Sequence, residues 1–256
     1  MISQAFQALK FEIRDKIGYV TFNRPVSTNP FSRQMTLELT ELCNQYSNVD
    51  PSVEALIFFG GAGRSFSVGG DFNDVSRLDQ ETDIRAYLGE IIDLYISILQ
   101  VRVPVVSAID RFAIGQGLQV ALMTDWRIGT ELCQTQMPEL KNGVACPLGS
   151  QILEFLFGRG RMLECILDCE FISATESRVL GILNRVVPVE ELLRTSTETA
   201  RRFSGYPTVS FAATKKIHNA RLMRALEDVR EDASLAHVAA FLNKSGKSHF
   251  EKILKK

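Results

Sequence analysis

Residues 60–72 read GGAGRSFSVGGDF, and residues 113–122 read AIGQGLQVAL. The two stretches come after the two clearest apolar runs of strand length, residues 55–59 and 104–109. A glycine near a strand end lets the backbone turn so that amide N–H groups face a cleft. Two such amides converging on one point would stabilise a developing oxyanion. Neither stretch is a phosphate-binding loop, because the first lacks GK[ST] and the second has Val120 where GxGxxG needs its last glycine.

The surrounding pattern predicts an α/β protein. Alternating residues on both sides of positions 15–18 indicate a β-hairpin over 10–22, and the proline-bearing stretch 23–30 indicates an irregular loop. Helical spacing follows over 32–46 and 84–99. The order strand, glycine loop, helix, strand recurs to about residue 188, which favours parallel strands joined by helical crossovers. From residue 189 only helices are expected, over 190–203, 208–220 and 221–243. We therefore divide the chain into an α/β core (1–188) and a C-terminal helical region (189–256).

Composition excludes several classes of protein. With 256 residues, 29 Lys+Arg and 30 Asp+Glu, the chain has a formal net charge of −1, which makes nucleic acid and anionic membranes unsuitable as main partners. No apolar run approaches the roughly 20 residues of a membrane span, and the N-terminus has no signal-like run, so a cytoplasmic protein is expected.

The five cysteines are expected to be buried free thiols. Only Cys165 and Cys169 are close, at a spacing that would place both on one face of a helix, and the three histidines lie far downstream, so no metal site is expected. Cys146, in the loop GVACPLGS, is close enough in sequence to Glu139 to line the same pocket.

Taken in order, SFSVGGDF, AIGQGLQ and MPELKNG (137–143) resemble the crotonase superfamily of acyl-CoA enzymes, over essentially the whole chain. The resemblance implies a spiral of ββα units with a C-terminal helical trimerisation region, assembled as a homotrimer or a hexamer. It implies an acyl-CoA substrate, no permanently bound cofactor, and a thioester enolate held by the backbone amides of Gly70 and Gln116. Substrate contacts are then expected from Val68 and Gly69, and coenzyme A contacts from the residues Arg24, Val26 and Phe66.

The acid/base groups decide the reaction within this superfamily. A hydratase of the superfamily uses two glutamates, at the positions of Gln119 and Glu139. An amide cannot act as a carboxylate base, so Gln119 argues against two-carboxylate hydration and is expected to contact the substrate instead. Glu139 remains as the catalytic carboxylate. Without the resemblance, Gln119 could be a polar helix residue of no function, and Glu139 a glutamate that starts a helix after Pro138.

The detailed motifs NPFSR (29–33), SFSVGGDFN, AIGQGLQVALM, MPELKNG and AHVAAF (236–241) resemble the carboxymethylproline synthase branch of the superfamily. That branch decarboxylates malonyl-CoA, joins the enolate to pyrroline-5-carboxylate, an amino-acid-derived co-substrate, and hydrolyses the thioester, in carbapenem biosynthesis. Decarboxylation needs an oxyanion hole more than a base. Glu139 would then activate the water that attacks the thioester.

Other site residues rest on the same resemblance. His237 would contact the carboxylate of the co-substrate, although a lone helical histidine can equally be a capped or partly exposed side chain. Tyr87 would be a pocket aromatic, or a core tyrosine. Phe250 and Lys252 would contact coenzyme A across a subunit interface, or belong to a solvated tail. Two other functions stay open: a single-glutamate enoyl-CoA isomerase or malonyl-CoA-type decarboxylase, and a non-catalytic binding protein of the same fold.

Overall fold

The computed structural model describes residues 6–24, 28–48, 50 and 52–242. The described strands are β1 (Leu9–Arg14), β2 (Ile17–Phe22), β3 (Ala55–Phe59), β4 (Val105–Ile109), β5 (Phe112–Ile114), β6 (Trp126–Thr130), β7 (Gln134–Gln136), β8 (Ile172–Ser173) and β9 (Arg185–Val187). The helices are α1 (Arg33–Gln45), α2 (Phe72–Val75), α3 (Glu81–Gln100), α4 (Gln116–Leu122), α5 (Pro147–Phe157), α6 (Arg159–Asp168), α7 (Ala174–Val179), η1 (Val189–Glu191), α8 (Leu192–Ser204), α9 (Thr208–Asp228) and α10 (Arg230–Leu242). No described helix is both long enough and apolar enough to span a bilayer.

The hairpin expected over 10–22 is confirmed. Strands β1 and β2 pair antiparallel, and Asp15 and Lys16 turn between them with φ values of 48° and 62°, the left-handed pair that a tight two-residue hairpin turn requires. From β2 onward the pairing is parallel, and the six-stranded sheet has the order β1-β2-β3-β4-β6-β9. Parallel neighbours need crossover connections, which the helices supply.

A second sheet of three strands, β5-β7-β8, makes the fold a spiral. The chain places β4 in the large sheet and β5 in the small one, then repeats this with β6 and β7. Successive strand pairs therefore turn a corner between the sheets, and a helix carries the chain back. This arrangement is the α/β spiral of ββα units with a C-terminal helical region that the sequence predicted.

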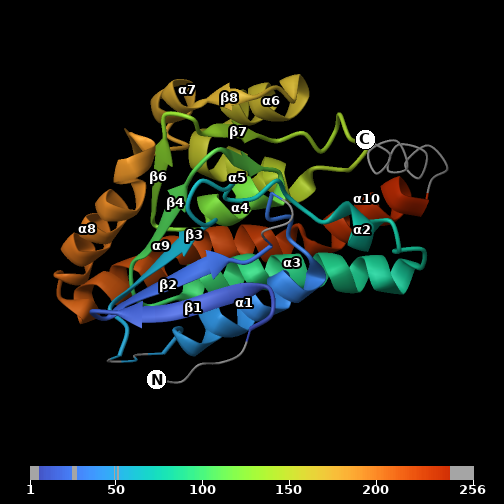
Figure 1. The fold of residues 1–256 in the computed structure, drawn as a ribbon. Coiled ribbons are helices and arrows are strands. Elements are labelled where there is room, and N and C mark those ends of the chain that lie inside the picture. Colours follow the sequence, from blue (N-terminus) through green and yellow to red (C-terminus); the bar gives the residue numbers. More distant parts are fainter. Residues whose placement is uncertain (1–5, 25–27, 49, 51, 243–256) are drawn as a thin grey trace.

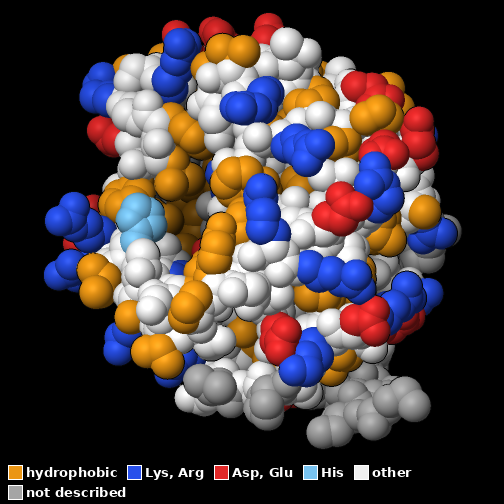
Figure 2. All heavy atoms as spheres, turned by 90° about the vertical axis from the view of Figure 1, so that its left-hand side faces the viewer, with side chains coloured by type: hydrophobic (Ala, Val, Ile, Leu, Met, Phe, Trp, Pro, Cys, Tyr) orange, Lys and Arg blue, Asp and Glu red, His pale blue; other side chains and the backbone are white. Residues whose placement is uncertain are grey.

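Both faces of the large sheet are covered, which explains why its strands read as continuous apolar runs. On β3, Leu56 and Phe58 pack into the main core with α1 and α3, whereas Ala55 and Ile57 pack with Leu192 and Ala200 of α8. Figure 1 shows α8 standing along one side of the sheet, away from α1 and α3. The opposite side of α8 faces solvent, and Figure 2 shows basic and acidic side chains interspersed over this side of the molecule.

The C-terminal helices differ from prediction in where they divide. We expected a break between residues 220 and 221, and this was wrong: α9 continues to Asp228 and α10 begins at Arg230. Residues 208–228 contain no glycine or proline to stop a helix, and the Asn219 side chain bonds across to the Leu99 carbonyl oxygen at 2.9 Å instead of disturbing its own helix. Arg230 marks the new start by pairing with Asp93 of α3, the helix against which α9 and α10 pack.

The cysteines are free thiols, as predicted, but Cys165 and Cys169 do not lie as predicted. All five thiols are free, and four of them are buried, with Cys165 half-buried. Cys169 does not share a helix face with Cys165, because α6 ends at Asp168 and Cys169 adopts a left-handed φ of 51° as its C-cap. The Cys169 thiol donates to the carbonyl oxygen of Ile166 at 3.0 Å, which offsets part of the cost of that conformation.

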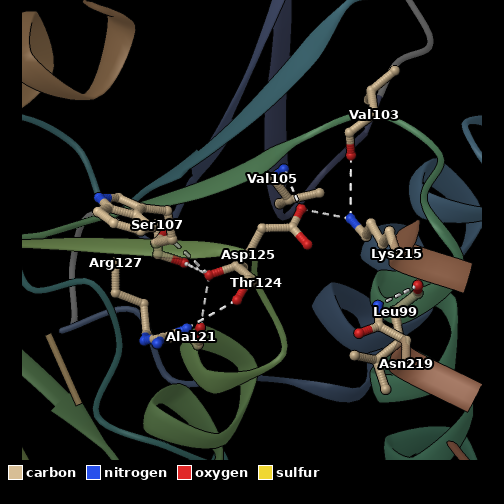
Figure 3. A network of polar contacts seen from close by, with 11 residues as sticks. Leu99, Val103, Val105, Ser107, Ala121, Thr124, Asp125, Arg127, Lys215 and Asn219 are labelled. Carbon is tan, nitrogen blue, oxygen red and sulfur yellow. Dashed lines mark hydrogen bonds and ion pairs between the residues drawn. The ribbon is translucent and has the colours of Figure 1, made fainter. Parts of the chain in front are cut away.

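A buried ion pair anchors α9 to the start of β4 (Figure 3). Lys215 is 7% exposed, and its Nζ lies 2.6 Å from Oδ2 of Asp125 and 3.2 Å from the carbonyl oxygen of Val103. The same Asp125 oxygen accepts from the backbone N–H of Val105 at 2.8 Å. One carboxylate thus fixes the C-terminal helical region to the starts of β4 and β6.

Lys215→Met is expected to lower the free energy of unfolding by about 3 kcal/mol, because it leaves the Asp125 charge without its partner. The matched control is Lys216→Met, at the neighbouring exposed position, which should change stability by less than about 0.5 kcal/mol. Urea unfolding of both variants measures the difference. Equal, small effects would show that the pair contributes nothing to the docking of α9.

Candidate active site

The two glycine loops lie side by side, joined by backbone hydrogen bonds. The amide of Ser67 donates to the carbonyl oxygen of Phe112, and the amide of Ile114 donates to the carbonyl oxygen of Ser67, each at 3.0 Å. These bonds make a short parallel bridge between the first loop and β5. The bridge brings Gly69 and Gly70 next to Gly115 and Gln116, which are about 45 residues away in sequence.

Glycine is required at two positions in this contact. Gly69 has a φ of +95°, and a Cβ there would lie 3.0 Å from the carbonyl oxygen of Ile114 and 3.5 Å from the amide nitrogen of Gln116. Gly115 has a φ of +52°, and a Cβ there would lie 3.2 Å from Oε1 of Glu139. A side chain at either position would be strained; at Gly69 it would press on the second loop, and at Gly115 on the Glu139 carboxylate.

The backbone amides of Gly70 and Gln116 are both free to bind a ligand. Neither donates a hydrogen bond to any part of the chain that the structure describes, and both residues line one cavity. Gln116 is the first residue of α4, so its N–H has no acceptor inside the helix. The pair has the character of an oxyanion hole: two unused donors beside each other at the mouth of a buried space.

The cavity has a volume of about 110 Å³ that is accessible to water-sized groups. Nine residues predicted from the sequence line it: Val68, Gly69, Gly70, Tyr87, Gln116, Gln119, Glu139, Cys146 and His237. Much of the remaining wall is apolar, from Phe72, Val75, Leu88, Ile91, Val144, Leu148 and Phe241. No lysine or arginine of the described chain lines it, so a bound anion would depend on neutral donors or on a protonated histidine.

Glu139 and Gln119 are held together by a direct hydrogen bond. Nε2 of Gln119 donates to Oε1 of Glu139 at 2.8 Å, and the hydroxyl of Tyr95 donates to Oε1 of Gln119 at 2.8 Å. The second carboxylate oxygen, Oε2 of Glu139, is buried and has no hydrogen-bond partner in the described chain. Glu139 does not start a helix; it lies in the turn between β7 and α5.

Burial of the carboxyl group raises the pKa of Glu139 from 4.5 to about 7. Its own backbone amide, the Cys146 thiol and the Gln119 amide act in the opposite direction. The group can therefore exchange a proton near neutral pH, as a general acid or base must. Cys146 lines the same cavity, and burial followed by the nearby Glu139 charge raises the pKa of its thiol, which stays protonated.

Tyr87 offers a third donor close to the amide pair. A Cβ placed on Gly70 would lie 3.2 Å from the Tyr87 hydroxyl oxygen, and that hydroxyl has no hydrogen-bond partner in the described residues. Burial raises the pKa of Tyr87 well above its ordinary value, so the phenol remains a donor at neutral pH. Tyr87 is thus a pocket residue and not only a core tyrosine.

His237 reaches the cavity from α10, which is remote from every other site residue in sequence. It is 6% exposed and packs edge-to-face on Phe241. Nδ1 lies 2.8 Å from the carbonyl oxygen of Ala233, which can only accept, so Nδ1 carries the proton. Burial lowers the pKa of His237, and the ring is neutral near pH 7, with Nε2 left as an acceptor. Contact with a carboxylate would require the ring to take up a proton.

Two residues that were predicted to contact coenzyme A, Phe66 and Arg24, do not line the cavity. The Phe66 ring is fully buried and packs edge-to-face on Phe22 with 4.9 Å between centroids, in the core that large aromatics favour. Its contact with coenzyme A stays a prediction. Arg24 pairs with Asp71, the N-cap of α2, at 2.8 Å and so lies near the first glycine loop without lining the cavity. Val26, Phe250 and Lys252 lie outside the described residues.

Sequence reasoning missed Tyr95, which holds the Gln119 amide from α3. A signal was present: Tyr87, Ile91 and Tyr95 are spaced by four residues, so they form one stripe of the helix, and all three line the cavity. Asn142 and the apolar wall residues of α3 and α5 gave no such signal, because their patterns are those of any loop or amphipathic helix.

Comparison with known proteins shows the family of the chain. The model of the family described as enoyl-CoA hydratase/isomerase matches residues 12–253. The chain therefore belongs to the enoyl-CoA hydratase/isomerase family, within the crotonase superfamily, and is an acyl-CoA enzyme that uses coenzyme A thioesters as substrates.

Individual relatives are more specific. Carboxymethylproline synthase from Pectobacterium carotovorum subsp. carotovorum is 36% identical over 245 residues, which cover 96% of this chain and 98% of the relative. Among solved structures, ThnE from S. clavuligerus aligns with a TM-score of 0.73 and 32% identity over 88% of this chain and 98% of its own. An enoyl-CoA hydratase/isomerase from Mycobacterium paratuberculosis aligns with a TM-score of 0.85 and 25% identity, over 96% and 98%.

Glu139→Gln is expected to stabilise the protein, and more so at high pH. The folded protein binds the Glu139 proton more tightly than the unfolded chain, because the pKa is about 7 when folded against 4.5 for the free group. The free energy of unfolding of the wild type therefore falls as pH rises from about 4.5 to 7. The variant has no carboxyl group at this position, so its free energy of unfolding does not fall for this reason. The gain at pH 8 should exceed that at pH 5 by about 2 kcal/mol.

Denaturant unfolding at the two pH values measures this gain. Glu131→Gln, at an exposed position, is the matched control and should follow wild type at both. A Glu139→Gln variant that also follows wild type at both would contradict a buried carboxyl with a raised pKa.

Proposed function

We propose that this enzyme is a carboxymethylproline synthase: it decarboxylates malonyl-CoA, joins the enolate to pyrroline-5-carboxylate and hydrolyses the resulting thioester. The observation that carries the proposal is the Gln119–Glu139 pair, in which an amide stands where a hydratase needs its second carboxylate. The 36% identity to a carboxymethylproline synthase over nearly the whole of both chains supports the same reaction.

The first step needs no base from the protein. Loss of CO2 breaks the bond between the malonyl carboxylate and the α-carbon, and the electron pair stays behind as an enolate whose oxygen becomes negative. The amides of Gly70 and Gln116 are suited to hold that oxygen, and each donor of an oxyanion hole is worth on the order of 10²–10³ in rate. The apolar wall favours the same step, because a carboxylate there is poorly solvated and neutral CO2 is not.

The second step forms the carbon–carbon bond. The enolate carbon attacks C5 of the imine, the π electrons of the C=N bond move to nitrogen, and the nitrogen takes up a proton. His237 and Tyr87 are the residues we assign to the co-substrate. The co-substrate carboxylate would draw a proton onto Nε2 of His237, turning a neutral ring into a charged donor. The Tyr87 hydroxyl supplies a neutral donor beside it.

The third step uses the carboxylate. Oε2 of Glu139 accepts a proton from water, the hydroxide adds to the thioester carbonyl, and the same two amides hold the tetrahedral oxyanion. Collapse of the intermediate expels coenzyme A as its thiolate and leaves the free acid. A pKa of about 7 suits this role, because about half of the groups are then ionised near pH 7 and the carboxylate is basic enough to take the proton.

We also propose, from the family resemblance, that coenzyme A lies along the loop at Arg24 and Val26. Phe250 and Lys252 would contribute to its binding from the C-terminus, in a homotrimer or a dimer of trimers. The segment Val68–Gly70 would contact the acyl portion of the thioester, since it lines the cavity beside Gln116.

A second candidate is favoured by the same lone carboxylate. An enoyl-CoA isomerase or a simple malonyl-CoA decarboxylase also needs an oxyanion hole and at most one glutamate. Incubation with malonyl-CoA, with and without pyrroline-5-carboxylate, separates these functions by product: carboxymethylproline for the synthase, acetyl-CoA alone for the decarboxylase. Turnover of an enoyl-CoA without turnover of malonyl-CoA would identify an isomerase. Turnover of neither substrate would favour a non-catalytic binding protein.

Glu139→Ala is expected to slow thioester hydrolysis by about 10²–10⁴ and to leave decarboxylation much less affected, since only hydrolysis needs a proton acceptor. Carboxymethylproline should then accumulate as its coenzyme A thioester, where wild type releases free acid. A mass-resolved time course with both substrates follows the two steps. Free acid released at the wild-type rate would refute the base assignment, and equal loss of both steps would make Glu139 a structural residue.

His237→Ala is expected to raise the concentration of pyrroline-5-carboxylate needed for half-maximal rate by about tenfold or more, with little change for malonyl-CoA, because it removes a hydrogen bond to a charged group. His218→Ala, at an exposed position of α9, is the matched control and should leave both values unchanged. Steady-state kinetics with each substrate varied in turn gives the answer. Equal losses for both substrates would place His237 outside the co-substrate site.

A further inference from the structure

Tyr95 is a fully buried residue of the site, and it takes no part in the three reaction steps of the proposed function. The residue is 0% exposed, on the stripe of α3 that faces the cavity, and its hydroxyl lies 2.8 Å from Oε1 of Gln119. A buried phenol without a partner is costly, so this bond is strongly favoured. Burial, followed by the nearby Glu139 charge, raises the pKa of Tyr95, which therefore keeps its proton.

The bond from Tyr95 decides which way the Gln119 amide points. An amide offers oxygen on one side and NH2 on the other, and its two ends could exchange without changing shape. With its oxygen held by Tyr95, Gln119 must present Nε2 to Oε1 of Glu139, which it meets at 2.8 Å. The flipped amide would set its oxygen against the Glu139 carboxylate and leave the Tyr95 proton without an acceptor.

Close packing keeps the amide in this plane. Nε2 of Gln119 also lies 3.5 Å from the Sδ of Met137, and a Cβ placed on Gly149 would come within 3.2 Å of it. Gly149 thus leaves room for the amide and little more. The result is an asymmetric carboxylate: Oε1 of Glu139 is occupied, and Oε2 is buried without a partner.

We propose that Tyr95 is a positioning residue whose hydroxyl fixes the direction of the Gln119 amide, so that Gln119 binds Oε1 of Glu139 and leaves Oε2 as the oxygen that accepts a proton. The inference rests on the proposed function, in which Glu139 is the general base.

The other groups that share the cavity with Glu139 would not mask this effect. They are Tyr87 on α3, Cys146 at the start of α5 and His237 on α10. The raised pKa values of the phenol and the thiol and the lowered pKa of the imidazole leave all three uncharged near pH 7. The Gln119 hydrogen bond lowers the pKa of Glu139, so its loss should move that pKa upward from about 7.

Tyr95→Phe is the direct test, because it keeps the ring and removes only the hydroxyl. The matched control is Tyr19→Phe, which removes a tyrosine hydroxyl 3.0 Å from Oγ1 of Thr197, between β2 and α8. The Glu139 carboxyl is titrated by NMR of protein carrying carboxyl-¹³C glutamate, its signal identified by its absence in Glu139→Gln. This reading needs no turnover. The pH profile of thioester hydrolysis is measured in parallel.

In Tyr95→Phe we expect the Glu139 titration to move up by about half a pH unit or more, and the acid limb of hydrolysis to move with it, while Tyr19→Phe changes neither. An unmoved Glu139 titration overturns the inference. A moved titration with an unmoved hydrolysis profile supports the positioning of Glu139 by Tyr95 and overturns the base assignment instead.

A second measurement covers the case in which Tyr95→Phe does not fold. In wild type the side-chain NH2 signals of Gln119, identified with Gln119→Asn, should exchange slowly with solvent and shift as Glu139 titrates. Signals that exchange rapidly and ignore the titration would show a freely turning amide and overturn the inference.

Discussion

Everything at this site depends on the contact between two backbones at Gly69 and Gly115. Hydrogen bonds between the first loop and β5 hold the chain there so closely that no side chain fits. The contact costs conformational freedom at two glycines, and in return it sets two unused amides side by side at the edge of a cavity. The spiral of the fold makes this possible, because β4 and β5 lie in different sheets and the second loop therefore turns toward the first.

Charge is scarce among the described residues of the cavity, and this gives Glu139, the one carboxylate among them, its properties. Glu139 is buried beside an amide, a thiol and apolar side chains, and its pKa rises to about 7 as a result. A second carboxylate at position 119 would bring two negative charges within hydrogen-bond distance, which couples their titrations. The Gln119 amide avoids this coupling, so Glu139 titrates without a second carboxylate beside it. The burial costs stability at neutral pH, a common cost of an active site.

The C-terminal helices belong to the site as much as to the scaffold. α10 carries His237 and Phe241 to the cavity wall, and Arg230 at its start pairs with Asp93 of α3, the helix that carries Tyr87 and Tyr95. α9 is held at the starts of β4 and β6 by the Lys215–Asp125 pair. α10 therefore completes the cavity only when it is docked, so the Arg230–Asp93 pair, far from the chemistry, helps to place His237.

The sequence by itself determined the hairpin, the buried strands, the two glycine loops and nine of the cavity residues, because these depend on local patterns or on motifs of fixed order. It did not determine the end of α9, the place of Phe66 or the function of Tyr95. α9 runs on past Asn219, whose side chain bonds to the Leu99 carbonyl oxygen of α3, and the Phe66 ring packs in an aromatic core with Phe22. Tyr95 reads as an ordinary core residue of an amphipathic helix. Only the tertiary structure brings its hydroxyl to Gln119, 24 residues away, since hydrogen bonds between side chains depend on distances that no local pattern encodes.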